Sequence, residues 1–282
     1  AGADILGGAG VRSTRQLVDE VEEDRITDAC RRILIAKFQM GLFENPYADE
    51  AQAEAVIGSE AHRAVAREAA ARSFTLVKYE NAVSLAGQKL IVAGSLAQDV
   101  RCLNSGWTAK EPVEIQGKTI LQGLRDKAGA ENVTYIETAG EAPADLKGVS
   151  AVVVVGEKSG THEPAWGAAT LEFPEEQLAL LSALKQAGAN VTAVVVMNRA
   201  YVLTPVVENA DSVLLAYRPG VTCGADALAD TLFGENAVTG KLPFQIPASM
   251  EQVLSQREDM PKDIESPLYE YGFGIDVESY GR

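Results

Sequence analysis

Short apolar runs alternate along most of the chain with longer segments in which apolar residues recur every three or four positions. The short runs are rich in β-branched and aromatic residues and end at glycine, polar or charged positions, as buried strands do. They span residues 74–80, 90–95, 132–138, 151–157, 191–198 and 212–220. The helical pattern covers residues 59–73, the surroundings of Leu121 and Leu124, 175–188 and 225–234. Because helical crossovers between strands join parallel neighbours, the pattern predicts an α/β fold with a mainly parallel sheet.

The two ends of the chain follow different patterns. Residues 13–41 have helical spacing, with Thr27 as the expected start of a second short helix and Gly41 as its end. The residues after Gly41 include an Asn-Pro pair and predict a linker. The tail segments 240–247 and 266–277 are rich in proline, glycine and aromatic residues, which predicts ordered loops and short edge strands.

Composition excludes several classes of partner. The 25 basic and 40 acidic residues give a net charge of −15, which argues against nucleic acid or an anionic membrane as a partner. No apolar run approaches the roughly 18 residues of a membrane span, and no signal peptide is visible, so we expect a soluble chain of undetermined compartment. Two histidines and three well-separated cysteines make a metal site unexpected.

Common catalytic motifs are also missing. The chain has no GxGxxG dinucleotide motif, no phosphate-binding loop and no GxSxG nucleophile elbow. We therefore expect no nucleotide cofactor and no serine hydrolase chemistry.

The stretch from Val152 to Glu163, VVVVGEKSGTHE, carries the candidate chemistry. In open α/β sheets, working groups lie on loops beyond the carboxyl ends of such buried strands. Glu157 comes directly at the strand end and is either a catalytic carboxylate or a structural one that stiffens the loop. Glu163 stands next to a proline and close to Trp166, where partial desolvation would raise its pKa as a general acid requires.

Two neighbours of Glu163 could contact a substrate. Trp166 offers a flat apolar face that suits a sugar ring, although it could equally pack within the loop. His162 is either a substrate contact or an ordinary surface residue.

Several motifs together resemble one known family. The matching segments, in chain order, are KFQMGLFENPY, VVVVGE with the following HE pair, NADSVLLAYRPG, ADALADTLFGENAVTGKLPFQIP and LYEYGFG. Together they resemble the carboxyl-terminal part of glycoside hydrolase family 3, which includes β-glucosidases. The resemblance implies a three-layer α/β sandwich with a mainly parallel, about six-stranded sheet. It also implies that residues 1–41 end a (β/α)₈ barrel, that 42–53 are the interdomain linker and that 54–282 form the sandwich domain. We accordingly expect a fragment or a processed chain.

The resemblance also implies a function. The chain would be the carboxyl-terminal part of a retaining, exo-acting β-glycosidase that needs no cofactor, with Glu163 as general acid/base and Glu157 in a structural role. The nucleophilic aspartate of the family lies on the barrel and is absent from this chain. The expected partners are a β-linked oligosaccharide or glycoside, contacted by His162 and Trp166, and the barrel domain itself. The alternative is a non-catalytic sugar-binding or assembly module of the same fold.

Overall fold

The computed structural model describes residues 3–5, 15, 19–104, 115–158, 170–257, 260 and 262–281. Contacts between residues divide the chain into two compact units, Ala1–Ser59 and Glu60–Arg282.

The first unit contains the long helix α2, Glu23–Gln39. This helix runs unbroken through Thr27, so the cap expected at Thr27 is wrong. Residues 15, 19 and 20 are also helical, and the helical conformation is interrupted at residues 21–22, before α2 begins. No glycine or proline interrupts α2, and Asp28 pairs with Arg31 and Arg32 one turn further on, which favours a continuous helix. Gly41, with a φ of 67°, ends the helix as expected. Its N–H and that of the next residue donate to the carbonyls of Phe38 and Lys37, which is the Schellman arrangement.

A second helix of this unit, α3, spans Glu50–Val56. The expected linker 42–53 therefore ends in a helix, which begins because the Asp49 carboxylate accepts a hydrogen bond from the Gln52 N–H at 3.0 Å. Several large apolar side chains of the unit are more than a third exposed. They are Ile5, Leu34, Ile35, Phe38, Met40, Leu42, Phe43, Tyr47, Val56 and Ile57. The described part of this unit thus leaves an apolar surface in contact with solvent.

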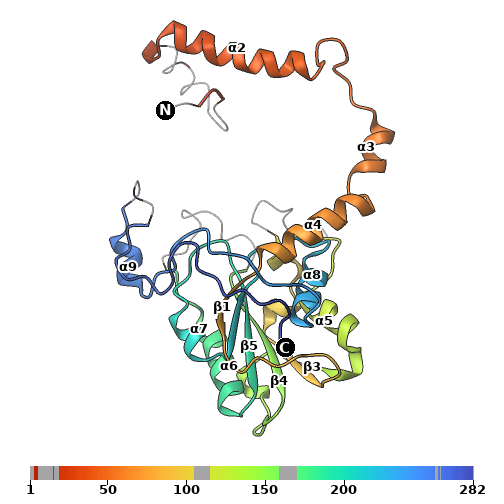
Figure 1. The fold of residues 1–282 in the computed structure, drawn as a ribbon, viewed down its shortest axis with the longest axis vertical. Helices are drawn as coiled ribbons and strands as arrows, with labels where there is room; N and C mark the ends of the chain where they lie inside the picture. The colour runs from red at the N-terminus through yellow and green to blue at the C-terminus, as the bar shows by residue number, and fades with distance from the viewer. Residues whose placement is uncertain are drawn as a thin grey trace. The chain divides into compact units, whose positions relative to one another are not determined.

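The second unit is built on a six-stranded sheet in the order β1-β6-β5-β4-β2-β3 (Figure 1). The strands are β1 Thr75–Tyr79, β2 Leu90–Ala93, β3 Val133–Ile136, β4 Ser150–Gly156, β5 Asn190–Val196 and β6 Ser212–Leu215. All neighbours are parallel except β1, which pairs antiparallel with β6 and aligns Thr75 with Leu215. The predicted mainly parallel sheet and its six strands are confirmed.

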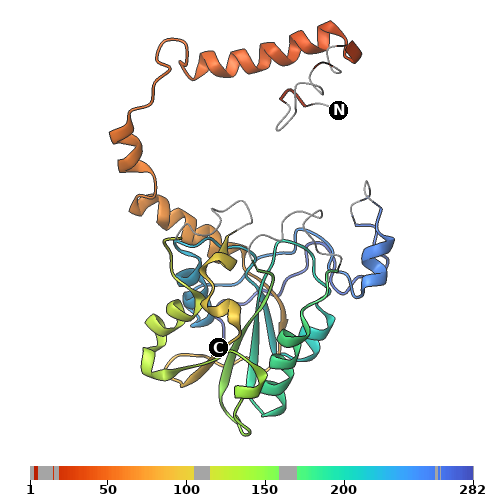
Figure 2. The ribbon, with the colours of Figure 1, turned by 180° about the vertical axis from the view of Figure 1, so that it is seen from behind.

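Helices cover both faces of the sheet and make three layers (Figures 1 and 2). One face carries α4 Glu60–Ser73, α5 Ile120–Ala128 and α8 Gly224–Leu232. The other carries α6 Glu175–Gln186 and α7 Thr204–Glu208. Short 3₁₀ turns occupy Ser95–Gln98, Val100–Leu103, Ala130–Asn132 and Ala139–Glu141, and α9 spans Met250–Ser255.

Strand β4 shows why the sheet is so apolar. Val152 and Val154 join the core on one face, whereas Val153 and Val155 join the core on the other. A strand buried on both faces needs an apolar residue at nearly every position, and that requirement explains the run of valines.

The tail wraps the sandwich without the expected edge strands in its described residues. Those residues form isolated bridges instead, among them Val238 with Val277 and Ile246 with Tyr269. The prolines in both segments lack the N–H groups that a ladder needs. The tail nevertheless closes the domain, because the Tyr280 hydroxyl lies 2.7 Å from that of Thr192 in the core.

Asp230 joins three helices through charge. Its carboxylate accepts hydrogen bonds from Arg67 on α4, at 3.0 Å from Nε, and from Lys127 on α5, at 2.8 Å. Burial acts to raise the pKa of Asp230, but the hydrogen bonds from Lys127 and Arg67 outweigh it, so the pKa is lowered. A lowered pKa in the folded state means that the stabilisation is present above the unfolded pKa of about 3.9 and is lost as pH falls through the folded value.

We expect Asp230→Asn to lower the free energy of unfolding by about 2 kcal/mol at pH 7, because it removes the charge from two hydrogen bonds. The deficit should shrink below pH 4, where the wild-type carboxylate also begins to protonate. Urea unfolding at pH 7 and pH 3 measures both values. Asp276→Asn is the control, since the exposed pair of Asp276 with Lys241 is worth less than about 1 kcal/mol. A deficit that is equal at the two pH values contradicts the assignment.

Candidate functional site

The strand order marks one edge of the sheet as a site for chemistry. From β2 the chain moves to β3 on one side and then returns to β4 on the other, so the direction of strand order reverses between β2 and β4. In open α/β sheets, ligands bind outside the carboxyl ends of the strands at such a reversal. Glu157 immediately follows the carboxyl end of β4.

The backbone before Glu157 is fixed by close packing. Gly156 has a φ of 132°, and a Cβ there would lie 1.9 Å from the carbonyl oxygen of Val196 on β5. The side-chain amide of Gln177 on α6 accepts from the Gly156 N–H at 2.8 Å and donates to its carbonyl at 3.0 Å. Only glycine fits this position, and the direction in which Glu157 leaves the strand is therefore set.

Glu157 is buried, with 3% of its surface exposed. Its Oε1 accepts from the backbone N–H groups of Asn198 and Arg199, which follow β5. Its Oε2 accepts from Arg199 Nη2 at 2.9 Å and from Nε at 3.3 Å. Arg199 Nη2 also donates to the Tyr201 hydroxyl at 3.0 Å, and burial, with the charge of Glu157, raises the pKa of that phenol. Both carboxylate oxygens of Glu157 thus accept hydrogen bonds from residues that follow β5.

A second guanidinium approaches from the exit of β6. Arg218 Nη2 lies 3.9 Å from Glu157 Oε1, and the Arg218 side chain is only 7% exposed. Burial lowers the pKa of Arg218, and the negative charge of Glu157 opposes this effect. The preceding residue, Tyr217, has a φ of 54°, which is an unusual conformation for a bulky side chain. Two guanidinium groups and one carboxylate therefore meet where the exits of β4, β5 and β6 converge.

Sequence reasoning identified Glu157 but missed Arg199, Tyr201 and Arg218. The positions of the two arginines in the sequence could have indicated them. Each lies three residues after the end of a buried apolar strand, and Glu157 likewise follows the end of β4. Parallel neighbours bring their carboxyl ends to one edge, so charges at equivalent positions of adjacent strands should meet there.

The other predicted site residues cannot be placed. The structure describes the chain up to Lys158 and again from Thr170 onward, so His162, Glu163 and Trp166 lie outside the described residues. Lys158 is exposed and is the last described residue before them.

A hollow of about 380 Å³ lies at the reversal point between β2 and β4. The residues that follow β2 and β3, the end of β4 and the first turns of α6 line it. Its polar side chains include Ser95, Glu137, Thr138 and Glu176. Hydroxyl and carboxylate groups of this kind can hydrogen-bond to the hydroxyls of a sugar.

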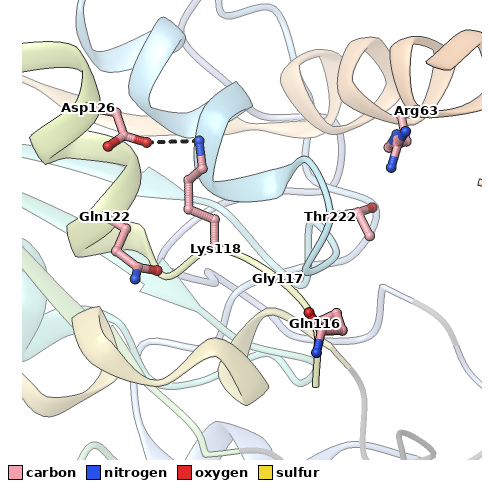
Figure 3. A pocket seen from close by; sticks show the side chains of 7 residues that line it. All are labelled: Arg63, Gln116, Gly117, Lys118, Gln122, Asp126 and Thr222. Atoms are coloured by element: carbon pink, nitrogen blue, oxygen red, sulfur yellow. Dashed lines mark ion pairs between the residues drawn. The ribbon is translucent and has the colours of Figure 1, made fainter. Parts of the chain in front are cut away.

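A larger hollow of about 490 Å³ lies beside the start of α5 (Figure 3). It is lined by Arg63, Gln116, Gly117, Lys118, Gln122, Asp126 and Thr222. Lys118 turns toward Asp126, 2.9 Å away (Figure 3). Its Nζ also lies 2.7 Å from the carboxylate of Asp226. These two carboxylates balance the charge of Lys118, so we assign its ammonium group a structural role rather than a role in ligand binding.

Within the described residues, no group of three or more histidine, cysteine, aspartate or glutamate side chains could hold a metal ion. None of the helices in the same part of the chain is long and apolar enough to cross a membrane.

Comparison with known families decides the relationship. Residues 74–277 match the family model of the glycosyl hydrolase family 3 C-terminal domain. The chain belongs to glycosyl hydrolase family 3. The match covers the whole sheet from β1 to β6, and it confirms the resemblance that the sequence motifs indicate.

The curated relatives include proteins named β-glucosidases and others named β-xylosidases. The chain is 30% identical to "Beta-glucosidase C" of Emericella nidulans over 99% of this chain and 41% of that protein. It is 31% identical to "Probable beta-glucosidase C" of Aspergillus oryzae over 98% of this chain and 39% of that protein. The family 3 chain described here therefore spans about two fifths of the length of these relatives.

Solved structures in the family share the fold. The exo-1,3/1,4-β-glucanase of a Pseudoalteromonas species matches with a TM-score of 0.73 and 26% identity, over 94% of this chain and 35% of that one. The β-glucosidase of Listeria innocua in complex with gluconolactone matches with a TM-score of 0.71 and 25% identity, over 98% and 42% respectively.

Proposed function

We propose that this chain is the carboxyl-terminal part of a retaining, exo-acting β-glycosidase that hydrolyses terminal non-reducing β-D-glycosyl residues. The observation that carries the proposal is the family 3 match across the sheet, combined with the place of the Glu157 loop. That loop leaves β4 at the reversal of strand order, where sheets of this kind bind their ligands. The β-glucosidase names of the relatives support the substrate class.

The proposed mechanism is a double displacement. Two carboxyl groups about 5–5.5 Å apart flank the scissile bond of a retaining glycosidase. One attacks the anomeric carbon, while the other protonates the leaving oxygen and later removes a proton from water. We assign the second role to Glu163 and the first to an aspartate on a barrel domain. His162 and Trp166 would contact the sugar in this scheme.

Glu157 has a different role in the proposal. Its carboxylate accepts hydrogen bonds from two backbone N–H groups and from the Arg199 guanidinium, so its oxygens are already held by donors of the protein. We therefore propose that Glu157 anchors the start of the loop, while Glu163 exchanges protons with the substrate.

The barrel is the partner that the proposal requires. Residues 1–41 would be its last part and 42–53 the linker to the sandwich domain 54–282. Two observations support this division. The family match begins only at residue 74, and several large apolar residues of the first unit are exposed, among them Phe38 and Met40. A barrel in the same or a companion chain would bury such a surface.

The proposal predicts that the purified 282-residue chain hydrolyses no aryl β-glucoside above the uncatalysed rate, because it lacks the nucleophile. Release of the aryl alcohol, followed by absorbance, measures this. Addition of the barrel domain, or expression of the two as one polypeptide, should restore turnover. Turnover by the chain alone contradicts the division of catalytic groups. No turnover after the barrel is supplied would instead favour a non-catalytic sugar-binding or assembly module.

A further inference from the structure

The Arg218 guanidinium contacts three separate segments of the sandwich domain. Nη1 donates to the carbonyl oxygen of Cys102, near the end of the 3₁₀ turn Val100–Leu103. Nη2 donates to the carbonyl oxygen of Lys158 at 3.2 Å and lies 3.9 Å from the Glu157 carboxylate. One side chain thus joins the residues after β2 and after β4 to the exit of β6, on which it stands.

The backbone around Arg218 strengthens this junction. The N–H of Gly220, two residues further on, donates to the carbonyl of Leu103 at 2.9 Å. The β6 exit is therefore fixed to the 3₁₀ turn by main chain as well as by side chain. The Arg218 side chain itself joins Lys158 to the β6 exit.

Two unfavourable features coincide at this position. Burial of a guanidinium costs free energy unless hydrogen bonds and an opposite charge compensate for it. Tyr217 adopts a left-handed backbone conformation that a bulky side chain rarely takes. Such costs persist where the surrounding structure imposes them, and they cluster where a side chain must be aimed precisely.

We propose that Arg218 is a positioning residue that fixes the carbonyl of Lys158, and with it the starting point of the segment that carries Glu163, against the 3₁₀ turn and the β6 exit. The catalytic consequence of this role rests on the function proposed above. The structural part, a held carbonyl, stands on the described atoms alone.

The guanidinium suits this task better than other cations. Its planar fork donates in several directions at once, so it reaches the carbonyls of Cys102 and Lys158 while its charge faces Glu157. The ammonium of a lysine at this position is a compact charge on a flexible stem and would not span both carbonyls. Arg218→Lys should therefore retain the charge and lose much of the positioning.

Trypsin cleavage after Lys158 tests the held carbonyl directly. The carbonyl that accepts from Arg218 belongs to the bond that trypsin would cut, and it must be released before it can enter the oxyanion hole of the protease. We expect Arg218→Met to be cleaved after Lys158 about tenfold faster than wild type, since a hydrogen bond to a charged group is lost. Arg218→Lys should show an intermediate increase.

Two controls separate this effect from loss of stability. Cleavage after Lys147, which is exposed in a turn on the same domain, should be unchanged in every variant. Arg67→Met breaks the ion pair with Asp230 elsewhere in the fold and should leave cleavage after Lys158 at the wild-type rate. Wild-type cleavage after Lys158 in Arg218→Met overturns the proposal, as does an equal increase after Lys147.

Kinetics of the polypeptide completed with its barrel test the catalytic consequence. Arg218→Met should reduce kcat more on substrates with poor leaving groups than on activated aryl glycosides, with little change in KM, and Arg218→Lys should recover part of the loss. Suppose that Glu163→Ala loses more kcat on the poor leaving group than on the activated one. An equal loss of kcat on both substrates in Arg218→Met then overturns this consequence. If Glu163→Ala fails to discriminate, the proposed acid role has failed, and cleavage after Lys158 alone decides the role of Arg218.

Discussion

Replacement of Glu163 by alanine, in the polypeptide completed with a barrel, is expected to lower kcat on an alkyl β-glucoside by roughly a hundredfold to ten-thousandfold. An alkoxide leaves poorly unless it is protonated, so loss of the general acid affects this substrate most. Dinitrophenyl β-glucoside, whose leaving group needs little protonation, should lose far less in its first step. The ratio kcat/KM on the two substrates, which reports the first step, measures the difference.

The matched control is Glu172→Ala. Glu172 is an exposed glutamate a short distance along the chain that hydrogen-bonds to the Thr170 hydroxyl, and its loss should change neither rate by more than about twofold. The acid role of Glu163 would be refuted by an equal fall on both substrates, and also by a rate that stays near wild type on the alkyl glucoside.

Replacement of Glu157 by glutamine is expected to produce the largest loss of stability, about 3–5 kcal/mol in the free energy of unfolding. The side chain keeps its size, but Arg199 and Arg218 lose their shared negative charge where the side chain of Arg218 is only 7% exposed. Uncompensated buried charge costs more than a lost neutral hydrogen bond. Urea unfolding of the 282-residue chain at pH 7 measures the change.

A double-mutant cycle identifies the cause of this loss. In the Arg199→Met background, Glu157→Gln should lower the free energy of unfolding by less than it does in wild type. One of the two guanidinium groups that would lose their carboxylate partner is already absent there. Additive costs would assign the loss to packing instead. A loss below about 1 kcal/mol in the single variant would mean that the carboxylate carries no structural charge role.

The sheet could be predicted from the sequence because it is buried on both faces. Val152 to Val155 show no alternation, and that pattern is specific to a strand covered by helices on both sides. The same runs defined all six strands, and glycine after an apolar run located the exit of β4. Thr27 misled because threonine favours helix starts, whereas the unbroken spacing around it favoured one helix.

The meeting of charges at the strand exits was harder to predict. Glu157 lies about forty positions from Arg199 and about sixty from Arg218, so their contact depends on strand order, which local pattern does not contain. The five-residue helix α7 and the six-residue helix α9 are also too short to show a period. The assignment of Glu163 came from family motifs and remains a prediction.

Because β1 pairs with β6, it cannot enter the sheet until most of the chain has been synthesised. Thr75 must wait for Leu215, 140 positions later (215 − 75), before it can enter the sheet. At about 5–20 residues per second, translation needs roughly 7–28 s to supply that partner. Through that interval β1 is an exposed, largely apolar strand with Lys78 as its single charge, and a lysine within a strand discourages pairing with other chains. The first strand of the sandwich therefore stays without its partner in the sheet until the sixth strand is made.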